Sequence, residues 1–294
     1  SLNHRTRAFL KVQDGCDYKC SFCTIPLARG KSRSNTVSNV IDNVYEIVSR
    51  NIKEIVLTGI NLGDFGKTEK NEIKNSFFDL IKELDKLSLD VRFRISSIEP
   101  NLLSDEIIEF VSTSKKFVHH FHIPLQSGSD SILKLMRRRY DSKLYKSRIE
   151  KINQLMPDAS IGADVIVGFP GENDDLFLES MDFIDNLNIS YLHVFSYSER
   201  DNTHAIKLPK TVELNIRSKR SKLLRILSSR KKSTFYNKFL GTTHDVLFES
   251  EEKNGFIEGF SPNYLRFRKK WDSKLAGMIV KSRFNKIDSE GYAT

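Results

Sequence analysis

Three cysteines, Cys16, Cys20 and Cys23, are the only cysteines among 294 residues, and they lie within the single stretch QDGCDYKCSFCTIP. Three thiols cannot all pair in disulfides, and clustered cysteines in a chain without an export signal indicate metal or redox chemistry in a reducing compartment. A structural zinc site normally has four ligands, and no histidine is near enough in sequence to be an obvious fourth. In a 4Fe-4S cluster, three thiolates would leave one iron open to a substrate or cofactor. The spacing therefore predicts a 4Fe-4S cluster bound by these three residues.

The first 206 residues alternate between apolar, β-branched runs and segments with helical spacing of apolar residues. Six βα units in succession predict a parallel sheet with helices outside it. They span about 190 residues, fewer than the roughly 250 of a closed eight-fold barrel. We therefore expect an α/β fold, a partial six-unit (β/α) barrel rather than a doubly wound sheet, with its chemistry at the carboxyl ends of the strands. The expected strands centre near residues 10, 56, 94, 121, 164 and 193.

Residues 241–294 have a different pattern, since short β-rich runs follow one another with no helical segment between them. Asn254-Gly255 is a strong hairpin signal between two of these runs. The pattern predicts a small all-β, OB-like barrel of the kind that binds oligonucleotides. We therefore divide the chain into a partial barrel at 1–206, a linker helix at 207–240 and the β-barrel at 241–294.

The positive charge is concentrated in residues 207–240, which hold 11 of the 47 basic residues and one of the 38 acidic residues. Their net charge is thus 11 − 1 = +10, against +9 for the whole chain. Such a local excess is typical of a nucleic-acid-binding surface, although a solvated helix face has a similar composition. On the predicted strand beyond the helix, we expect Phe267 to pack in the core. The candidate RNA contacts are Arg217, Lys219, Arg220, Arg225, Arg230, Lys231, Lys232, Tyr264 and Arg266.

Two features of the sequence narrow the cellular setting. No run of 18 apolar residues is present, and the N-terminal residues lack an apolar signal-peptide core. We therefore expect a cytoplasmic protein with no membrane partner. Because the sequence begins with Ser1 rather than Met, we also expect it to be an excised fragment.

The spacing Cys-x-x-x-Cys-x-aromatic-Cys after the first strand of a six-unit barrel resembles that of the radical-SAM enzymes. The resemblance implies that the open iron is chelated by the amino and carboxylate groups of S-adenosylmethionine (SAM). An electron from the cluster would then release a 5′-deoxyadenosyl radical, which the protein positions and shields. Phe22, directly before Cys23, matches the position that lies near the adenine, and core packing is its alternative role.

Further blocks resemble the methylthiotransferases of that superfamily, in order along almost the whole chain. The blocks are GCDYKCSFCTIPLARGKSRS, EIVLTGINLGDFG, RISSIEP, HFHIPLQSGSDSILKLMRRRYD and IGADVIVGFPGE. The variants LTGINLG and SSIEP most resemble the branch that acts on N6-threonylcarbamoyladenosine in tRNA. The resemblance implies 2-methylthiolation of that nucleoside beside the anticodon. It also implies a tRNA anticodon stem-loop rather than DNA as partner, an electron donor, and a C-terminal TRAM domain.

The resemblance, together with positions at the ends of predicted strands, indicates which residues contact SAM. A glycine there lets a ligand approach the backbone, a carboxylate can accept hydrogen bonds from ribose hydroxyls, and a guanidinium matches a carboxylate. Arg138 and Arg139 could equally meet RNA phosphates, and Ser127 could instead cap the following helix. The expected SAM contacts are Phe22, Thr58, Gly59, Glu99, Gln126, Ser127, Arg138, Arg139 and Gly168.

The sequence departs from the family pattern in two places. Methylthiotransferases carry an N-terminal domain with three more cysteines and an auxiliary 4Fe-4S cluster that handles sulfur, whereas this sequence begins at the strand before the first cluster. We therefore expect residues 1–294 to form the radical without completing sulfur insertion. The loop after the sixth strand, SYSERDNTHA, has Glu199 and Asp201 where the family has a Pro- and Gly-rich turn, which leaves contacts of this loop with SAM or tRNA in question.

Other functions stay open on the sequence alone. One is a methylthiotransferase for isopentenyladenosine in tRNA or for a ribosomal protein, and the latter would be expected to lack the basic helix. Another is a non-catalytic RNA-binding protein with a structural iron or zinc site. In that protein the blocks around Gly59, Glu99 and Gly168 would have no use.

Overall fold

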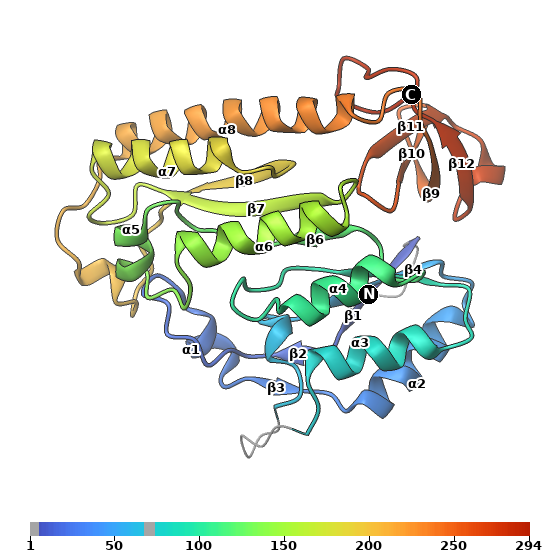
Figure 1. Cartoon of the computed structure of the whole chain (residues 1–294), viewed down its shortest axis with the longest axis horizontal. Helices are drawn as coiled ribbons and strands as arrows, with labels where there is room; N and C mark the ends of the chain where they lie inside the picture. The colour runs from blue at the N-terminus through green and yellow to red at the C-terminus, as the bar shows by residue number, and fades with distance from the viewer. Residues whose placement is uncertain (1–5, 68–73) are drawn as a thin grey trace.

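The computed structural model describes residues 6–67 and 74–294, in which a long helix links an α/β part to a C-terminal β-sheet (Figure 1). Six parallel strands form the sheets β1-β4-β5 and β6-β7-β8, and an isolated bridge between Ser97 and His122 connects the two. The strands are β1 (Arg7–Lys11), β4 (Glu54–Thr58), β5 (Arg92–Ile95), β6 (His120–His122), β7 (Ser160–Val167) and β8 (Tyr191–Ser196). The six predicted strand positions and the partial barrel are confirmed.

Helices cover the outer face of these strands (Figure 1). Most begin at a side chain that accepts a backbone N–H three residues later, as Thr36, Ser104, Asp141 and Asn173 do. Ser76 goes further and forms a reciprocal capping box. The helices are α2 (Val37–Val48), α3 (Phe77–Lys86), α4 (Asp105–Thr113), α5 (Asp130–Leu135), α6 (Ser142–Leu155) and α7 (Asp174–Asn186).

Alternation of side chains along the strands separates an apolar face from a polar one. On β7 and β8, Ala163, Val165 and Val194 pack beneath the helices in the main apolar core. The intervening Asp164 and His193 lie on the opposite, concave face of the sheet, where they approach each other. The concave face of the barrel is therefore the polar one.

Helix α8 (Leu214–Asn237) runs along β8 and α7 (Figure 1). It begins later than the expected residue 207, because Ala205–Lys207 form a 3-10 turn and Lys210 has a φ of 61°, which a right-handed helix does not contain. Among the described residues, no helix is both long and apolar enough to cross a membrane.

The C-terminal part is a curled antiparallel sheet with the strand order β11-β10-β9-β12. Asn254 and Gly255 have φ angles of 52° and 79°, so the predicted hairpin between β9 and β10 is confirmed. Phe267 is 1% exposed in a separate apolar core, to which the end of α8 contributes Phe235 and Tyr236. Closure of this sheet into a barrel stays a prediction. The strands are β9 (Thr243–Lys253), β10 (Phe256–Phe260), β11 (Arg266–Lys270) and β12 (Ile279–Arg283).

A buried ionic network fixes the C-terminal sheet against the amino ends of the parallel strands. Glu54 is fully buried and accepts hydrogen bonds from Arg92 at 2.6 Å and from Arg94 at 3.0 Å. The same two arginines donate to the backbone carbonyls of Phe260 and Pro262 in the C-terminal part. The cysteines lie at the opposite, carboxyl ends of the strands, which is where the candidate active site lies.

Candidate active site

The cysteine loop follows β1 and lies between the two short paired strands β2 (Gln13–Asp14) and β3 (Arg33–Ser34). Gly15 begins it with a φ of 70°, and a Cβ at this position would lie 2.0 Å from the Lys31 carbonyl oxygen. Only glycine fits that close approach. Cys16 N donates to the Gly30 carbonyl oxygen at 3.1 Å, which ties the two ends of the loop together.

The three thiols are free, partly exposed, and each accepts a hydrogen bond from this chain. The backbone N–H groups of Tyr18 and Ile25 donate to Cys16 and Cys23 at 3.4 Å, and Arg138 Nη1 donates to Cys20 at 3.0 Å. Burial raises the pKa of Cys16 to about 11 and also raises that of Cys20, where Arg138 opposes the shift. Binding of an electrophilic metal centre would therefore displace protons from these thiols.

The arrangement fits an iron-sulfur cluster better than a single zinc ion. Zinc binds thiolates at about 2.3 Å, so the sulfur atoms of one tetrahedral site lie roughly 4 Å apart. Within residues 6–67 and 74–294, the group whose ligand atoms all lie within 4.8 Å of one another is His122, Asp164 and His193, and it contains no cysteine. The wider spacing of three thiols in one loop suits a larger, multi-iron centre.

Two expected SAM contacts, Glu99 and Arg138, meet directly beside the cysteines. Arg138 is almost fully buried, forms an ion pair with Glu99, and also contacts Cys20 and Tyr140. Its guanidinium is thus directed at Glu99 and Cys20 rather than at solvent, and whether it contacts SAM or an RNA phosphate stays a prediction. Arg139, in contrast, is exposed and lies 3.9 Å above the ring of Tyr18.

Thr58 and Gly59 lie where β4 ends, next to the cysteine loop. The Thr58 carbonyl oxygen accepts a hydrogen bond from Val12 N at 2.9 Å. A Cβ on Gly59 would lie 2.9 Å from Gln13 Oε1, and that oxygen accepts the Asn61 N–H at 2.8 Å. Gly59 therefore lets Gln13 join the cysteine loop to the loop after β4, a structural role that was not predicted.

Gln126 and Ser127 follow β6 at the same end of the barrel. Gln126 has a φ of 66°, and its backbone pairs with β7 through Asp164 and Ile166. Ser127 is 1% exposed and accepts the Ser129 N–H at 3.2 Å. Ser129, without a side-chain capping hydrogen bond, occupies the N-cap position of α5, so Ser127 is not the N-cap residue.

Gly168 and Phe22 lie together, since the ring of Phe22 contacts Phe169 edge-on at 6.4 Å. Gly168 has a φ of 74°, and a Cβ there would lie 2.3 Å from Arg217 Cγ. Its N–H donates to Glu172 at 2.8 Å. Arg217 of helix α8 thus contacts the loop at Gly168, which the sequence analysis predicts to contact SAM.

Arg217 and Arg220 were expected to contact RNA, and the structure corrects this expectation. They are 3% and 5% exposed, and their guanidinium groups pair at 2.6 Å with Glu199 and Glu172 respectively. Both side chains therefore fasten α8 to the loops after β8 and β7. The acid at Glu199, which departs from the family pattern, is the partner of Arg217.

The remaining candidate RNA contacts differ in exposure. Arg230 pairs with Asp185, and Lys231 donates to backbone carbonyls at 2.7 and 3.0 Å, so both have partners within the chain. Tyr264 was expected to stack a base if exposed, but it is half-buried and stacks on His120 at 4.3 Å. Lys219 and Arg225 are exposed, and Lys232, Tyr264 and Arg266 line a cavity of about 420 Å³.

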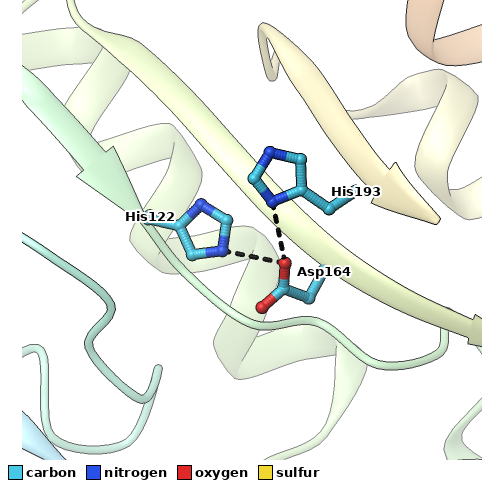
Figure 2. A group of neighbouring side chains, drawn as sticks. All are labelled: His122, Asp164 and His193. Carbon is cyan, nitrogen blue, oxygen red and sulfur yellow. Dashed lines mark ion pairs between the residues drawn. The ribbon is translucent and has the colours of Figure 1, made fainter. Parts of the chain in front are cut away.

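Sequence reasoning missed a polar cluster on the concave face, formed by His122 on β6, Asp164 on β7 and His193 on β8 (Figure 2). His122 Nε2 and His193 Nδ1 lie 2.9 and 3.3 Å from the same oxygen of Asp164. Asp164 lies inside β7 rather than at its carboxyl end, where the sequence analysis places the chemistry. The sequence could have revealed the cluster, because each of its residues alternates with core residues on one of three successive predicted strands.

Comparison with known proteins identifies the superfamily. The model of the radical SAM superfamily matches residues 10–184, which include the three cysteines, the end of β1 and the next four parallel strands. The chain belongs to the radical SAM superfamily.

Solved structures that resemble this chain support the fold, and only the fold. The radical S-adenosylmethionine methyltransferase TsrM from Kitasatospora setae has a TM-score of 0.54 at 13% identity, over 64% of this chain and 35% of that one. Coproporphyrinogen III oxidase from Escherichia coli has a TM-score of 0.51 at 15% identity, over 82% of this chain and 56% of that one.

Closer relatives place the chain in the methylthiotransferase family. It is 41% identical over 99% of its length to the threonylcarbamoyladenosine tRNA methylthiotransferase MtaB of Bacillus subtilis, and spans 64% of that relative. The MtaB of Rickettsia prowazekii is 36% identical, with 99% of this chain and 67% of the relative covered. The tRNA-2-methylthio-N(6)-dimethylallyladenosine synthase of Syntrophus aciditrophicus is 34% identical, with 86% of this chain and 54% of the relative covered.

Proposed function

We propose that this chain carries the radical-SAM and RNA-binding parts of a tRNA methylthiotransferase that converts N6-threonylcarbamoyladenosine, next to the anticodon, to its 2-methylthio derivative. One observation carries the chemistry: three free thiols share a loop with the buried Arg138–Glu99 pair at the carboxyl ends of the strands. A bound cluster and SAM would supply a radical that can remove a hydrogen from the base. The choice of nucleoside is supported by identities of 41% and 36% to the MtaB proteins of Bacillus subtilis and Rickettsia prowazekii, against 34% to the dimethylallyladenosine synthase of Syntrophus aciditrophicus.

In this proposal the residues around the cysteines bind and orient SAM. Arg138 holds Glu99 and Cys20 in fixed positions, and Arg139 remains exposed beside them for an anionic group. Thr58, Gln126 and Ser127 contribute backbone and side-chain polar groups from neighbouring strand ends. Phe22 and the loop at Gly168 would enclose the adenine.

The C-terminal part is proposed to be a TRAM-type domain that binds the tRNA anticodon stem-loop. It would extend over residues 241–294, with α8 as the link to the partial barrel at 1–206. Two observations support contact with RNA, namely the exposed cations Lys219 and Arg225 on α8 and the cations Lys232 and Arg266 around one cavity. The enzyme is proposed to be cytoplasmic and to take its electrons from a separate donor.

A second 4Fe-4S cluster is proposed for sulfur handling. The chain spans 64% of the Bacillus subtilis relative, and the three cysteines of residues 1–294 are all in the SAM-cluster motif. Thiolation would then require a segment outside these residues. Dimethylallyladenosine is the second candidate substrate, since its synthases are also relatives.

The test uses the 294-residue chain after anaerobic reconstitution and reduction with dithionite. Chromatography should show SAM-derived 5′-deoxyadenosine from the wild type and none from Cys20→Ala. The same reaction with tRNA should leave the nucleosides without methylthio groups. Efficient methylthiolation by residues 1–294 would refute the assignment of sulfur insertion to another segment, and a wild type without 5′-deoxyadenosine would refute the radical chemistry.

A further inference from the structure

The cluster of His122, Asp164 and His193 has no role in the function proposed above. Its members come from three adjacent strands, and both imidazoles meet one oxygen of Asp164 on the concave face (Figure 2). The side chain of His193 is 55% exposed, and those of Asp164 and His122 are 23% and 13% exposed. The cluster is thus open to a ligand on the side of His193.

The cluster lies next to the strand ends that are proposed to bind SAM. The backbone N–H of Gln126 donates to the carbonyl oxygen of Asp164 at 2.7 Å. From Asp164 the strand needs four more residues to reach Gly168, or roughly 13 Å at 3.3 Å per residue. The cluster therefore lies roughly 13 Å along β7 from the strand end at which a radical would form.

Aromatic side chains lie between the cluster and the C-terminal part. The ring of Tyr191 lies 5.3 Å from that of His193, and its hydroxyl lies 3.0 Å from His120 Nε2. His120 in turn stacks on Tyr264 of the C-terminal part. A cavity of about 420 Å³ has His193 and Lys232 among its lining residues, but neither His122 nor Asp164, so it lies beside the most exposed member of the cluster.

The cluster is strongly polar. Partial burial would raise the pKa of Asp164, but hydrogen bonds from His122 and His193 outweigh it and hold that pKa well below its usual range. Asp164 is therefore an anion at neutral pH, with a second oxygen that can accept from a ligand. Each imidazole directs one ring nitrogen at Asp164, Nε2 of His122 and Nδ1 of His193, which leaves the other nitrogen of each ring for a ligand.

We propose that His122, Asp164 and His193 recognise a polar N6 substituent of the target adenosine, one that carries hydrogen-bond donors and a carboxylate. The inference rests on the proposed function and deepens it. A threonylcarbamoyl group offers N–H and O–H donors to Asp164 and a carboxylate to the imidazoles. A dimethylallyl group offers none of these and would leave the cluster desolvated without partners.

A site of this kind discriminates strongly between the two substituents. A pocket that is built to hydrogen-bond a substrate group can reject an analogue without it by roughly 10⁴-fold. The cluster would therefore recognise the N6 substituent. The phosphate contacts of α8 and the C-terminal sheet would bind the RNA whether or not the substituent is present. His193, the most exposed member, is the specificity-determining residue that is easiest to test.

The experiment measures dissociation constants of the 294-residue chain for three anticodon stem-loop RNAs by fluorescence anisotropy. The RNAs carry adenosine, N6-threonylcarbamoyladenosine or N6-dimethylallyladenosine beside the anticodon and are otherwise identical. We expect the wild type to bind the threonylcarbamoyl RNA at least ten-fold more tightly than either of the others. His193→Phe, which keeps a ring on the concave face, should reduce this ratio to about two without changing the affinity for the unmodified RNA.

His119→Ala is the matched control, since His119 also pairs with an aspartate, Asp158 at 3.0 Å, but outside the cluster. It should keep the full ratio, and His122→Asn serves as a second cluster variant if His193→Phe does not fold. An unchanged ratio in a folded cluster variant would overturn the inference, as would a wild type that prefers the dimethylallyl RNA or does not discriminate. Binding of none of the three RNAs would reject the proposed tRNA function, and the inference with it.

Discussion

Replacing Glu54 by Gln should destabilise the protein strongly, because Glu54 is the carboxylate that pairs with both Arg92 and Arg94 in the buried network. Gln keeps the size of the side chain but leaves two guanidinium groups without their counter-charge. Loss of one member of a buried ion pair typically costs about 3–5 kcal/mol. We expect a loss of this size in the free energy of unfolding at pH 7, measured by urea denaturation. Glu46→Gln, which breaks an exposed pair with Arg50, should cost at most about 0.5 kcal/mol.

The pH dependence gives a second measure of the same interaction. Burial opposes ionisation of Glu54, but Arg94 and Arg92 lower its pKa from 4.5 to about 2. A depressed folded-state pKa contributes stability above 4.5 that is lost as the pH falls toward 2, and the interval corresponds to about 3 kcal/mol. The difference between wild type and Glu54→Gln should therefore shrink over this range. A difference below 1 kcal/mol at pH 7, or one that does not depend on pH, would refute the reasoning.

Three further outcomes are expected. Iron and sulfide counts after anaerobic reconstitution should show one 4Fe-4S cluster in the wild type and a loss of it in Cys20→Ala, whereas a colourless zinc protein would contradict the cluster. The log-log salt dependence of tRNA binding should flatten by about 0.7–0.9 per lost phosphate contact when three exposed cations are replaced by Ala, and an unchanged slope would exclude that face of α8. These are Lys219, Lys222 and Arg225. Arg220→Ala should lower the free energy of unfolding by about 3–5 kcal/mol, because it leaves the buried Glu172 unpaired, and a loss no larger than that of Arg225→Ala would contradict this role.

The sequence predicts well what short-range patterns determine. The hairpin at Asn254-Gly255 follows from two residues that tolerate positive φ, and the strand positions follow from apolar runs. The start of α8 was misplaced because composition alone extended the basic segment to residue 207. Pro209 and the positive φ of Lys210 lie before the true start at Leu214.

Buried charges were the main failure of sequence reasoning. Arg217 and Arg220 recur at helical spacing with Leu224 and Leu227, and all four are buried on one stripe of α8. That spacing could have shown that the two arginines face inward. Their acidic partners, however, come from loops after other strands, and no local pattern predicts such pairs.

The contact of Tyr264 could not be predicted from strand patterns, whereas that of His193 could. Tyr264 precedes β11 in sequence but stacks on a histidine of the barrel, a contact that depends on how the two parts dock. His193, in contrast, could have been predicted to face Asp164, because both alternate with core residues on adjacent parallel strands.

The measurement that tests the central claim most directly is nucleoside mass spectrometry of tRNA from cells that lack the gene. We predict that 2-methylthio-N6-threonylcarbamoyladenosine disappears, that N6-threonylcarbamoyladenosine accumulates in its place, and that methylthiolated dimethylallyladenosine is unchanged. Persistence of the methylthio-threonylcarbamoyl nucleoside at normal levels, in cells with no other enzyme that makes it, would contradict the account, as would loss of the dimethylallyl derivative instead.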